Sequence, residues 1–233
     1  MEKISKPDMA VDGAEHKHLA EVLRAKAGER IVLCPNDGKD YVYEITAVEK
    51  RRTVLGYVSE TVNDTEAKLD LTVFFALLKG DKSELVVTKL TELGVKRIVP
   101  FVSEHTVKKG EKTDRLKRAA VEACKQCGRA VIPEVCEIIK FSDLCAMLDG
   151  YDKVVFAYEG AFAAGARLRE IIDGTEKSVA LIVGAEGGFA PHEVETISAK
   201  GVRAVTLGKR ILRAETASIA AAAVILSLCG EWE

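Results

Sequence analysis

The chain of 233 residues lacks the features that mark exported and membrane-spanning proteins. The longest apolar run, 219–228, is rich in alanine and too short to span a bilayer, so it is typical of a packed helix. The first residues contain no apolar segment of a signal peptide. The six cysteines are scattered without a disulfide framework, which suits a reducing compartment. We therefore expect a soluble cytoplasmic protein with no membrane partner.

Signatures of several common enzyme mechanisms are also missing. The sequence contains no Gly-Lys-Ser/Thr P-loop and no G-x-G-x-x-G dinucleotide pattern. Its four histidines include no H-x-x-x-H pair, and no G-x-S-x-G elbow is present, so hydrolytic chemistry is poorly supported. Cys124 and Cys127 form a C-x-x-C pattern, but no second pair and no histidine ligands accompany it. Small core-facing residues are the better interpretation of this pair, and we expect no metal.

Charge is distributed unevenly along the chain, although the formal net charge is only −2. Residues 1–67 carry 10 Lys and Arg against 13 Asp and Glu, and residues 134–233 carry 10 against 15. The middle segment, 68–133, is basic, with 14 against 8. Such a segment is either a phosphate-binding surface or a set of solvated helix faces, and the composition alone favours neither.

The chain divides into two regions with different patterns of expected strands. Residues 30–60 hold short alternating runs rich in β-branched residues, with a hairpin turn at Asn36-Asp37-Gly38, and predict a small barrel. The polar segment 60–68 predicts a linker. From Leu69 onward apolar strands alternate with helices, which predicts a mostly parallel α/β sheet. Strands are expected at 69–78, 97–101, 153–158, 179–184 and 203–207, and helices after an Asp81–Glu84 capping box, at 114–129 and at 215–228.

The most informative stretches are Leu181–Glu193 and Leu207–Ala217. In each, an apolar strand enters a glycine-bearing turn and then a helix start. Open α/β sheets bind their ligands where such strands end, and glycine allows close backbone approach. One Gly-Gly turn after a strand is usually only a turn, whereas two such exits predict a cofactor site. Arg210 and Arg213 flank two apolar residues that must pack on something, which favours a functional role for these arginines.

Several motifs together resemble one family, over nearly the whole length of the chain. The matching pieces are His18–Arg24, Lys79–Lys82, Lys89–Gly94, Glu122-Ala123 with Gln126 and Arg129, Gly184–Phe189 with Glu193, and Leu207–Ala217. The chain resembles the uridine-N3 methyltransferases of small-subunit ribosomal RNA, within the SPOUT class of knotted methyltransferases. It departs from the family pattern at Ala185, where proline is usual, and at His105, where arginine is frequent. Its N-terminus also lacks the aromatic and basic opening common in relatives.

The resemblance implies a fold, a cofactor and a substrate. The fold would be a PUA-like β-barrel over residues 1–67, followed over residues 68–233 by a SPOUT domain with a C-terminal trefoil knot. The cofactor would be S-adenosylmethionine. The substrate would be N3 of one uridine near the 3′ end of 16S ribosomal RNA, presented by the assembled small subunit. The protein would act as a homodimer whose active site lies near the partner chain.

The residues themselves, including those of the basic middle segment, suggest a mechanism consistent with this resemblance. We expect direct methyl transfer, in which Arg213 stabilises negative charge on the uracil oxygens and Glu186 or Glu215 accepts the N3 proton. Glu215 could instead merely cap the last helix. The expected cofactor-binding residues are Val183, Gly184, Glu186, Gly187, Gly188, Leu207, Gly208, Ile211 and Leu212, with Ile211 and Leu212 flanking the adenine. The expected RNA-binding residues are Arg24, Lys79, Lys82, Lys89, Arg115, Arg118, Lys125 and Arg129.

Two other functions stay open from the sequence. A SPOUT enzyme that methylates a ribose 2′-hydroxyl or a transfer RNA would share most of these motifs. A noncatalytic RNA-binding module would share the basic middle segment, but it would have no use for two intact glycine-bearing loops.

Overall fold

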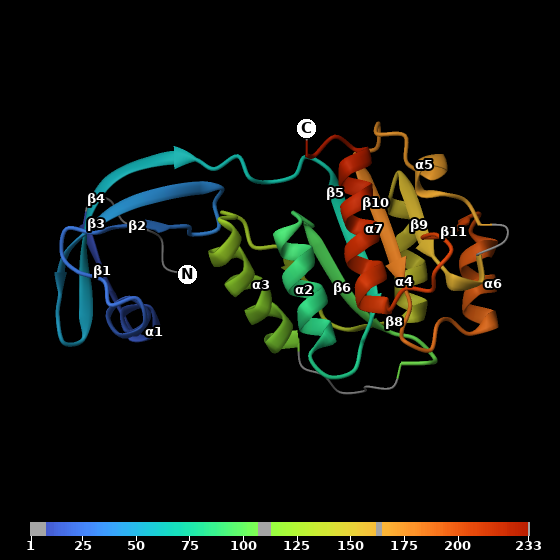
Figure 1. Cartoon of the computed structure of the whole chain (residues 1–233), viewed down its shortest axis with the longest axis horizontal. Helices are drawn as coiled ribbons and strands as arrows, with labels where there is room; N and C mark the ends of the chain where they lie inside the picture. The colour runs from blue at the N-terminus through green and yellow to red at the C-terminus, as the bar shows by residue number, and fades with distance from the viewer. Residues whose placement is uncertain (1–7, 107–112, 162–164, 233) are drawn as a thin grey trace. The chain divides into compact units, whose positions relative to one another are not determined.

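A computed structural model describes residues 8–106, 113–161 and 165–232, which belong to two compact units (Figure 1). The first unit holds the residues up to Glu66 together with Arg129–Val131, and the second holds Ala67–Gly128 and Ile132–Glu233. The linker expected at 60–68 falls at this division. Within the described ranges, no helix combines the length and apolar character that crossing a membrane demands.

The first unit is a four-stranded antiparallel sheet. Its strands are β1 (Asp8–Asp12), β2 (Arg30–Leu33), β3 (Lys39–Val48) and β4 (Arg52–Val62), in the order β1-β4-β3-β2. Alternate residues of β3 and β4 are buried, as the sequence pattern predicts, and form a small core of Tyr41, Tyr43, Ile45 and Leu55. Among the described residues the edge strands β1 and β2 do not pair with each other, so closure into a barrel stays a prediction.

A short helical segment connects β1 to β2. It consists of α1 (Gly13–Lys17) and the π-helical turn η1 (His18–Val22), and the imidazole Nδ1 of His16 lies 2.9 Å from the hydroxyl of Thr53 on β4. Arg24 follows with a φ of 51°, a conformation that non-glycine residues rarely adopt. Arg24, one of the residues expected to bind RNA, is exposed.

The second unit contains a fully parallel sheet, as expected from the alternation of strands and helices. Its long strands are β5 (Asp70–Ala76), β6 (Arg97–Val102), β9 (Lys153–Ala157) and β10 (Ser178–Val183). The order is β11-β9-β10-β5-β6-β7, with β8 also paired to β6. The short strands are β7 (Glu134–Val135), β8 (Ile139–Lys140) and β11 (Ala204–Val205).

Helices cover both faces of this sheet because its side chains alternate between two apolar cores (Figure 1). Leu71, Val73 and Phe75 of β5 face a core shared with α2 (Lys82–Glu92), α3 (Thr113–Cys127), α5 (Leu168–Ile171) and α7 (Ala214–Leu228). Phe74 and Ala76 face the other core, which α4 (Phe141–Met147) and α6 (Pro191–Ala199) cover. Two 3₁₀ turns, η2 (Leu148–Gly150) and η3 (Glu159–Ala161), complete the unit.

Two local predictions are wrong. The Asp81–Glu84 segment is not a capping box, since Asp81 makes no side-chain cap and instead accepts a hydrogen bond from Arg115 at 2.8 Å. Helix α3 ends at Cys127 rather than at 129, because Gly128 with its φ of 79° stops the helix. The trefoil knot implied by the resemblance stays a prediction.

Candidate functional site

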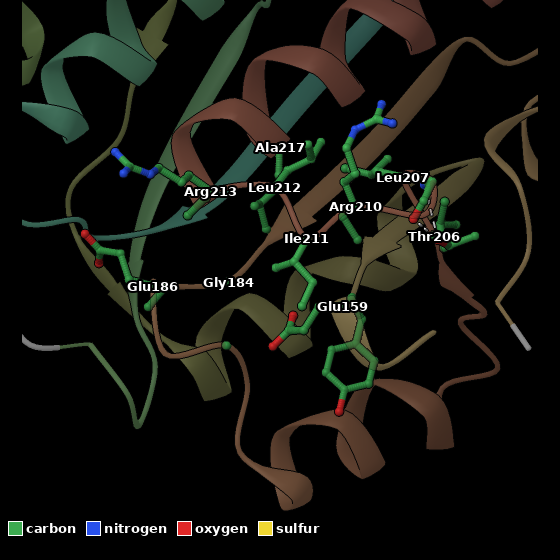
Figure 2. Close-up of a pocket in the computed structure, with 18 of the residues that line it drawn as sticks. Glu159, Gly184, Glu186, Thr206, Leu207, Arg210, Ile211, Leu212, Arg213 and Ala217 are labelled. Atoms are coloured by element: carbon green, nitrogen blue, oxygen red, sulfur yellow. Dashed lines mark hydrogen bonds between the residues drawn. The ribbon is translucent and has the colours of Figure 1, made fainter. Parts of the chain in front are cut away.

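A cavity of about 530 Å³ opens where the parallel strands β9, β10 and β11 end (Figure 2). Its size is that of a small-molecule binding site. This is the edge at which open α/β sheets place ligands, and two segments distant in sequence form its walls. The lining residues are Lys82, Ala157–Glu159, Val183–Glu186, Gly188, Val205–Gly208, Arg210–Ala214 and Ala217.

The turn after β10 forms one wall of the cavity and is closed tightly on itself. The amide of Gly188 donates to the carbonyl of Ala185 at 2.9 Å, and Gly188 has a φ of 70° that favours glycine. A Cβ at Gly184 would lie 2.7 Å from the ring of Phe189, so glycine is needed there too. Phe189 in turn stacks on Phe101, with ring centroids 6.3 Å apart. The turn is therefore fixed to the core beneath it.

His105 fastens the same turn from the β6–α3 loop. Its Nδ1 lies 2.9 Å from the carbonyl oxygen of Gly187 and donates to it. Next to it, the buried carboxylate of Glu193 accepts the amides of Glu104 at 3.0 Å and Ala190 at 2.9 Å. His105, one of the two positions at which the sequence departs from the pattern of the family it resembles, thus supports the turn. Gly187, expected to bind cofactor, lies against His105 and does not line the cavity.

Three charged side chains from α2, the β10 turn and α7 meet at one end of the cavity. The ammonium of Lys82 lies 3.1 Å from the carboxylate of Glu186 and 3.7 Å from that of Glu215. Burial works to raise the pKa of Glu186, but hydrogen bonds from Lys82 and from the amide of Lys79 outweigh it, and the net pKa is lowered. Glu186 is thereby held ionised. One carboxylate oxygen of Glu215 is buried and has no hydrogen-bond partner within the described ranges.

The loop between β11 and α7 forms the opposite wall. Gly208, with a φ of 110°, and Thr206 are linked by two hydrogen bonds, from the amide of Gly208 to the threonine hydroxyl and from that hydroxyl to the carbonyl of Gly208. Leu212 packs against the core, as the sequence predicts, but Ile211 is 84% exposed. The expectation that both apolar residues are packed is therefore wrong for Ile211, whose side chain instead lines the cavity (Figure 2).

Most residues expected from the sequence to bind cofactor or act in catalysis line this one cavity. They are Val183, Gly184, Glu186, Gly188, Leu207, Gly208, Ile211, Leu212 and Arg213. Glu215 does not line it; its carboxylate, on the first turn of α7, lies 3.7 Å from the ammonium of Lys82. Sequence reasoning missed Tyr158 and Glu159, although Tyr158 ends the strand predicted at 153–158 and Glu159 follows it. The signal was the rule that the carboxyl ends of parallel strands meet at one edge.

The residues expected to bind RNA occupy different settings. Lys82 lines the cavity, and Arg115 is paired with Asp81 and Glu84. Lys89 and Lys125 form surface pairs with Glu92 and Glu122 at 2.8 and 3.3 Å, whereas Lys79 and Arg118 are exposed.

Arg129 differs from all of the other basic candidates. Its side chain is 3% exposed and donates two hydrogen bonds to Glu66, at 2.9 and 2.6 Å. A phosphate could reach this guanidinium only by breaking the buried pair, so the geometry favours a structural role for Arg129.

Comparison with protein families identifies both units. A family described as an RNA methyltransferase domain matches residues 65–226, and a family described as an RNA methyltransferase PUA domain matches residues 11–55. An α/β domain with a ligand cavity at its strand ends, preceded by a PUA unit, is thus the class that fold and site define. The chain belongs to this RNA methyltransferase family.

Individual relatives are more specific in name. A "Ribosomal RNA small subunit methyltransferase E" of Bacillus subtilis is 31% identical over 229 residues, covering 94% of this chain and 90% of the relative. A crystal structure of the enzyme of that name from Neisseria gonorrhoeae, bound to S-adenosyl methionine, is 30% identical with a TM-score of 0.90. The match covers 100% of this chain and 97% of the Neisseria gonorrhoeae chain. A Legionella pneumophila protein solved with bound cofactor SAM is 28% identical with a TM-score of 0.84, covering 97% and 94%.

Proposed function

We propose that the chain transfers the methyl group of S-adenosylmethionine to N3 of a uridine in 16S ribosomal RNA of the small subunit, in the cytoplasm. The observation that carries this proposal is the cavity in which two backbone loops enclose Glu186, Arg213 and Lys82. The names of the relatives, two of which were solved with this cofactor, support it.

The residues of the cavity suit the cofactor and the reaction. When bound, S-adenosylmethionine supplies a methyl group on a positively charged sulfur. The backbone of the loops at 184–188 and 206–212 offers amides and carbonyls to its adenine and ribose. The ionised Glu186 lies at the same end as Arg213, and a carboxylate there favours a cationic ligand.

Methylation at N3 requires that the base lose the proton on that nitrogen. As the N3–H bond breaks, negative charge builds on N3, O2 and O4 of the uracil, and the guanidinium of Arg213 stabilises it. Forming the N3–C bond removes this charge again, and the methyl group's bond to the sulfonium of the cofactor would break in the same step, leaving a neutral thioether. Glu186 is the proton acceptor, directly or through one water molecule, because Glu186 lines the cavity and Glu215 does not. Glu215 holds Lys82, which in turn holds Glu186.

RNA docking must offset the cost of exposing N3. A paired or stacked uridine hides this atom, and splaying out the base costs roughly a few kcal/mol. The exposed basic residues Lys79 and Arg118, together with Arg24, would contact phosphates and offset this cost. We propose further that the protein works as a homodimer, which its mass in solution by light scattering would test.

The decisive experiment is mass spectrometry of nucleosides from 16S RNA. Small subunits lacking the modification are incubated with the protein and S-adenosylmethionine, and 3-methyluridine should appear only when both are present. A 2′-O-methyl nucleoside, or methylation of transfer RNA but not of small subunits, would assign the near alternative. Failure to bind S-adenosylmethionine in calorimetry would indicate an RNA-binding module.

A further inference from the structure

Glu159 places a carboxylate in the cavity to which the sequence assigned no role. It stands two residues after the end of β9, at the start of η3, and its exposed side chain lines the cavity (Figure 2). Its carboxylate has no hydrogen bond or ion pair with any residue in the described part of the chain. The other carboxylate lining the cavity, that of Glu186, is bound by Lys82. Among the described carboxylates that line the cavity, the carboxylate of Glu159 is therefore the one whose oxygens are available to a ligand.

The position of this carboxylate is made possible by the turn after β10. A Cβ at Gly188 would collide with Oε1 of Glu159, so a side chain there would displace the carboxylate from its present position. The φ of 70° at Gly188 favours glycine as well. Strand β9, which positions Glu159, pairs directly with β10, which leads into this turn. Two adjacent strands of the sheet, β9 and β10, and the turn that follows β10 therefore determine the position of the carboxylate.

The strand order fixes where Glu159 lies relative to the rest of the cavity. Strand β9 is flanked by β11 on one side and by β10 on the other. The loop after β11 leads to Thr206–Leu212, and the turn after β10 leads to Glu186, next to Lys82. Figure 2 accordingly shows Glu159 between Glu186 and Thr206. A ligand that spans both loops must pass the middle strand and its carboxylate.

The chemistry of an adenosine ligand matches this arrangement. The methyl-donating end belongs near Glu186 and Arg213, and the adenine belongs against the backbone of the loop after β11. The ribose joins these two parts, so it lies over the end of β9. A carboxylate only accepts hydrogen bonds, and a ribose diol offers two hydroxyl donors on adjacent carbons. An acidic residue binds ribose hydroxyls in the same manner in dinucleotide-binding α/β folds.

We propose that Glu159 binds the ribose 2′- and 3′-hydroxyls of the cofactor and thereby selects ribonucleoside ligands over deoxynucleoside ones. This inference rests on the proposed use of S-adenosylmethionine. Hydrogen bonds to an ionised carboxylate are stronger than those between neutral groups. A site built to bind a hydroxyl also discriminates against the analogue that lacks it, because the acceptor is then left without a partner.

Calorimetric titration with 5′-methylthioadenosine tests the inference without RNA and without the amino-acid part of the cofactor. Glu159→Ala should weaken its binding about 10- to 100-fold, the equivalent of a charged hydrogen bond. The 2′-deoxy analogue should bind the wild type more weakly, and it should lose less affinity in Glu159→Ala than the ribose ligand does, because only its 3′-hydroxyl contacts the carboxylate. This non-additivity would show that residue and hydroxyl interact directly. Glu159→Gln, which keeps an acceptor oxygen but loses the charge, should fall between wild type and Glu159→Ala.

A matched control separates this contact from a general effect of charge. Glu195→Ala removes an exposed carboxylate from α6, outside the cavity, and should bind every ligand as the wild type does. Weaker binding of S-adenosylmethionine in Glu159→Ala with unchanged binding of methylthioadenosine would assign Glu159 to the methionine ammonium and overturn the inference. Equal loss for the ribose and deoxyribose ligands would overturn it as well. A wild type that binds none of these ligands would refute the proposed function, whereas failure of Glu159→Ala alone would leave that function standing.

Discussion

At the scale of single residues, charged side chains give the two ends of the cavity different chemistry. Lys82 and Glu186 form an ion pair at 3.1 Å at the end where Arg213 also lies (Figure 2), and the carboxylate of Glu215 lies 3.7 Å from the same lysine. Glu159, which follows the middle strand β9, also lines the cavity with a charged side chain. The first group can act on a base brought to the cavity, and the second can hold the part of the cofactor that does not react.

Replacing Arg213 tests the residue proposed to stabilise charge on the uracil. In Arg213→Ala the rate of methyl transfer should fall about 10²- to 10³-fold, the usual effect of removing one donor to a developing oxyanion. Binding of S-adenosylmethionine should change little, because the charge arises only during the reaction. Single-turnover assays on small subunits measure the first quantity and calorimetry the second. Arg203→Ala, which removes an exposed arginine outside the cavity, is the control, and full activity in Arg213→Ala would exclude the assigned role.

The lowered pKa of Glu186 predicts how its contribution to stability depends on pH. Burial alone would raise this pKa, but the hydrogen bonds from Lys82 and Lys79 lower it overall, so the ionised form favours the folded state. That contribution is present at neutral pH and is lost as the pH falls through the lowered pKa. The melting temperature of Glu186→Gln should therefore lie below that of the wild type at about pH 7 and approach it toward about pH 4. Differential scanning calorimetry at both pH values measures these melting temperatures. A difference between wild type and variant that grows as the pH falls would contradict the lowered pKa of Glu186.

At the scale of elements, the turn after β10 depends on glycine for two separate reasons. Gly188 has a positive φ, and its missing side chain leaves room for Glu159. Gly201, between α6 and β11, has a similar φ of 77°, but a Cβ there would meet nothing within 4 Å. Substitutions at these two glycines therefore distinguish the free energy of backbone strain from the free energy of a steric collision.

Alanine at these two positions should have unequal effects on stability. Gly201→Ala should cost about 1–2 kcal/mol, the price of an unfavourable backbone conformation. Gly188→Ala should cost only a little more, because the colliding carboxylate of Glu159 ends an exposed, flexible side chain that can move aside. In the double variant Gly188→Ala with Glu159→Ala, the excess over Gly201→Ala should disappear. Urea unfolding of the variants measures these differences, and equal losses at both glycines would show that the collision is relieved at no cost.

The elements of the sheet were largely predictable from the sequence, because buried parallel strands are almost continuously apolar. The run at 69–78 and the helix at 215–228 differ from β5 and α7 by a few residues at most. Side-chain partners distant in sequence were not predictable. Glu66 binds Arg129 across 63 positions, and Lys82 binds Glu186 across 104, and no local pattern encodes such pairs. The role of Glu159 depends on strand order, which only the fold reveals.

At the scale of the whole molecule, the excess of basic residues in 68–133 is not a single surface. Lys82 belongs to the cavity, Arg129 is buried against Glu66, and Arg115 is bound by two carboxylates. What remains for phosphate is a smaller exposed set that includes Lys79 and Arg118. Part of the uneven charge therefore stabilises the fold or lines the cavity. Phosphate binding by the remaining basic residues stays a prediction.

Salt dependence should separate the two kinds of arginine. Arg118→Glu removes a proposed phosphate contact, so binding to small subunits should weaken, and the slope of log K against log salt should fall in magnitude by about 1. Arg129→Met should leave that slope unchanged, since a buried guanidinium paired with Glu66 displaces no counterions from RNA. It should instead lower the free energy of unfolding by about 1–3 kcal/mol, because one charge of a buried pair loses its partner. Filter binding across a range of salt, combined with denaturant unfolding, measures both effects. If Arg129→Met flattened the slope while Arg118→Glu did not, RNA would have to open the Glu66 pair, and the structural role assigned to Arg129 would be wrong.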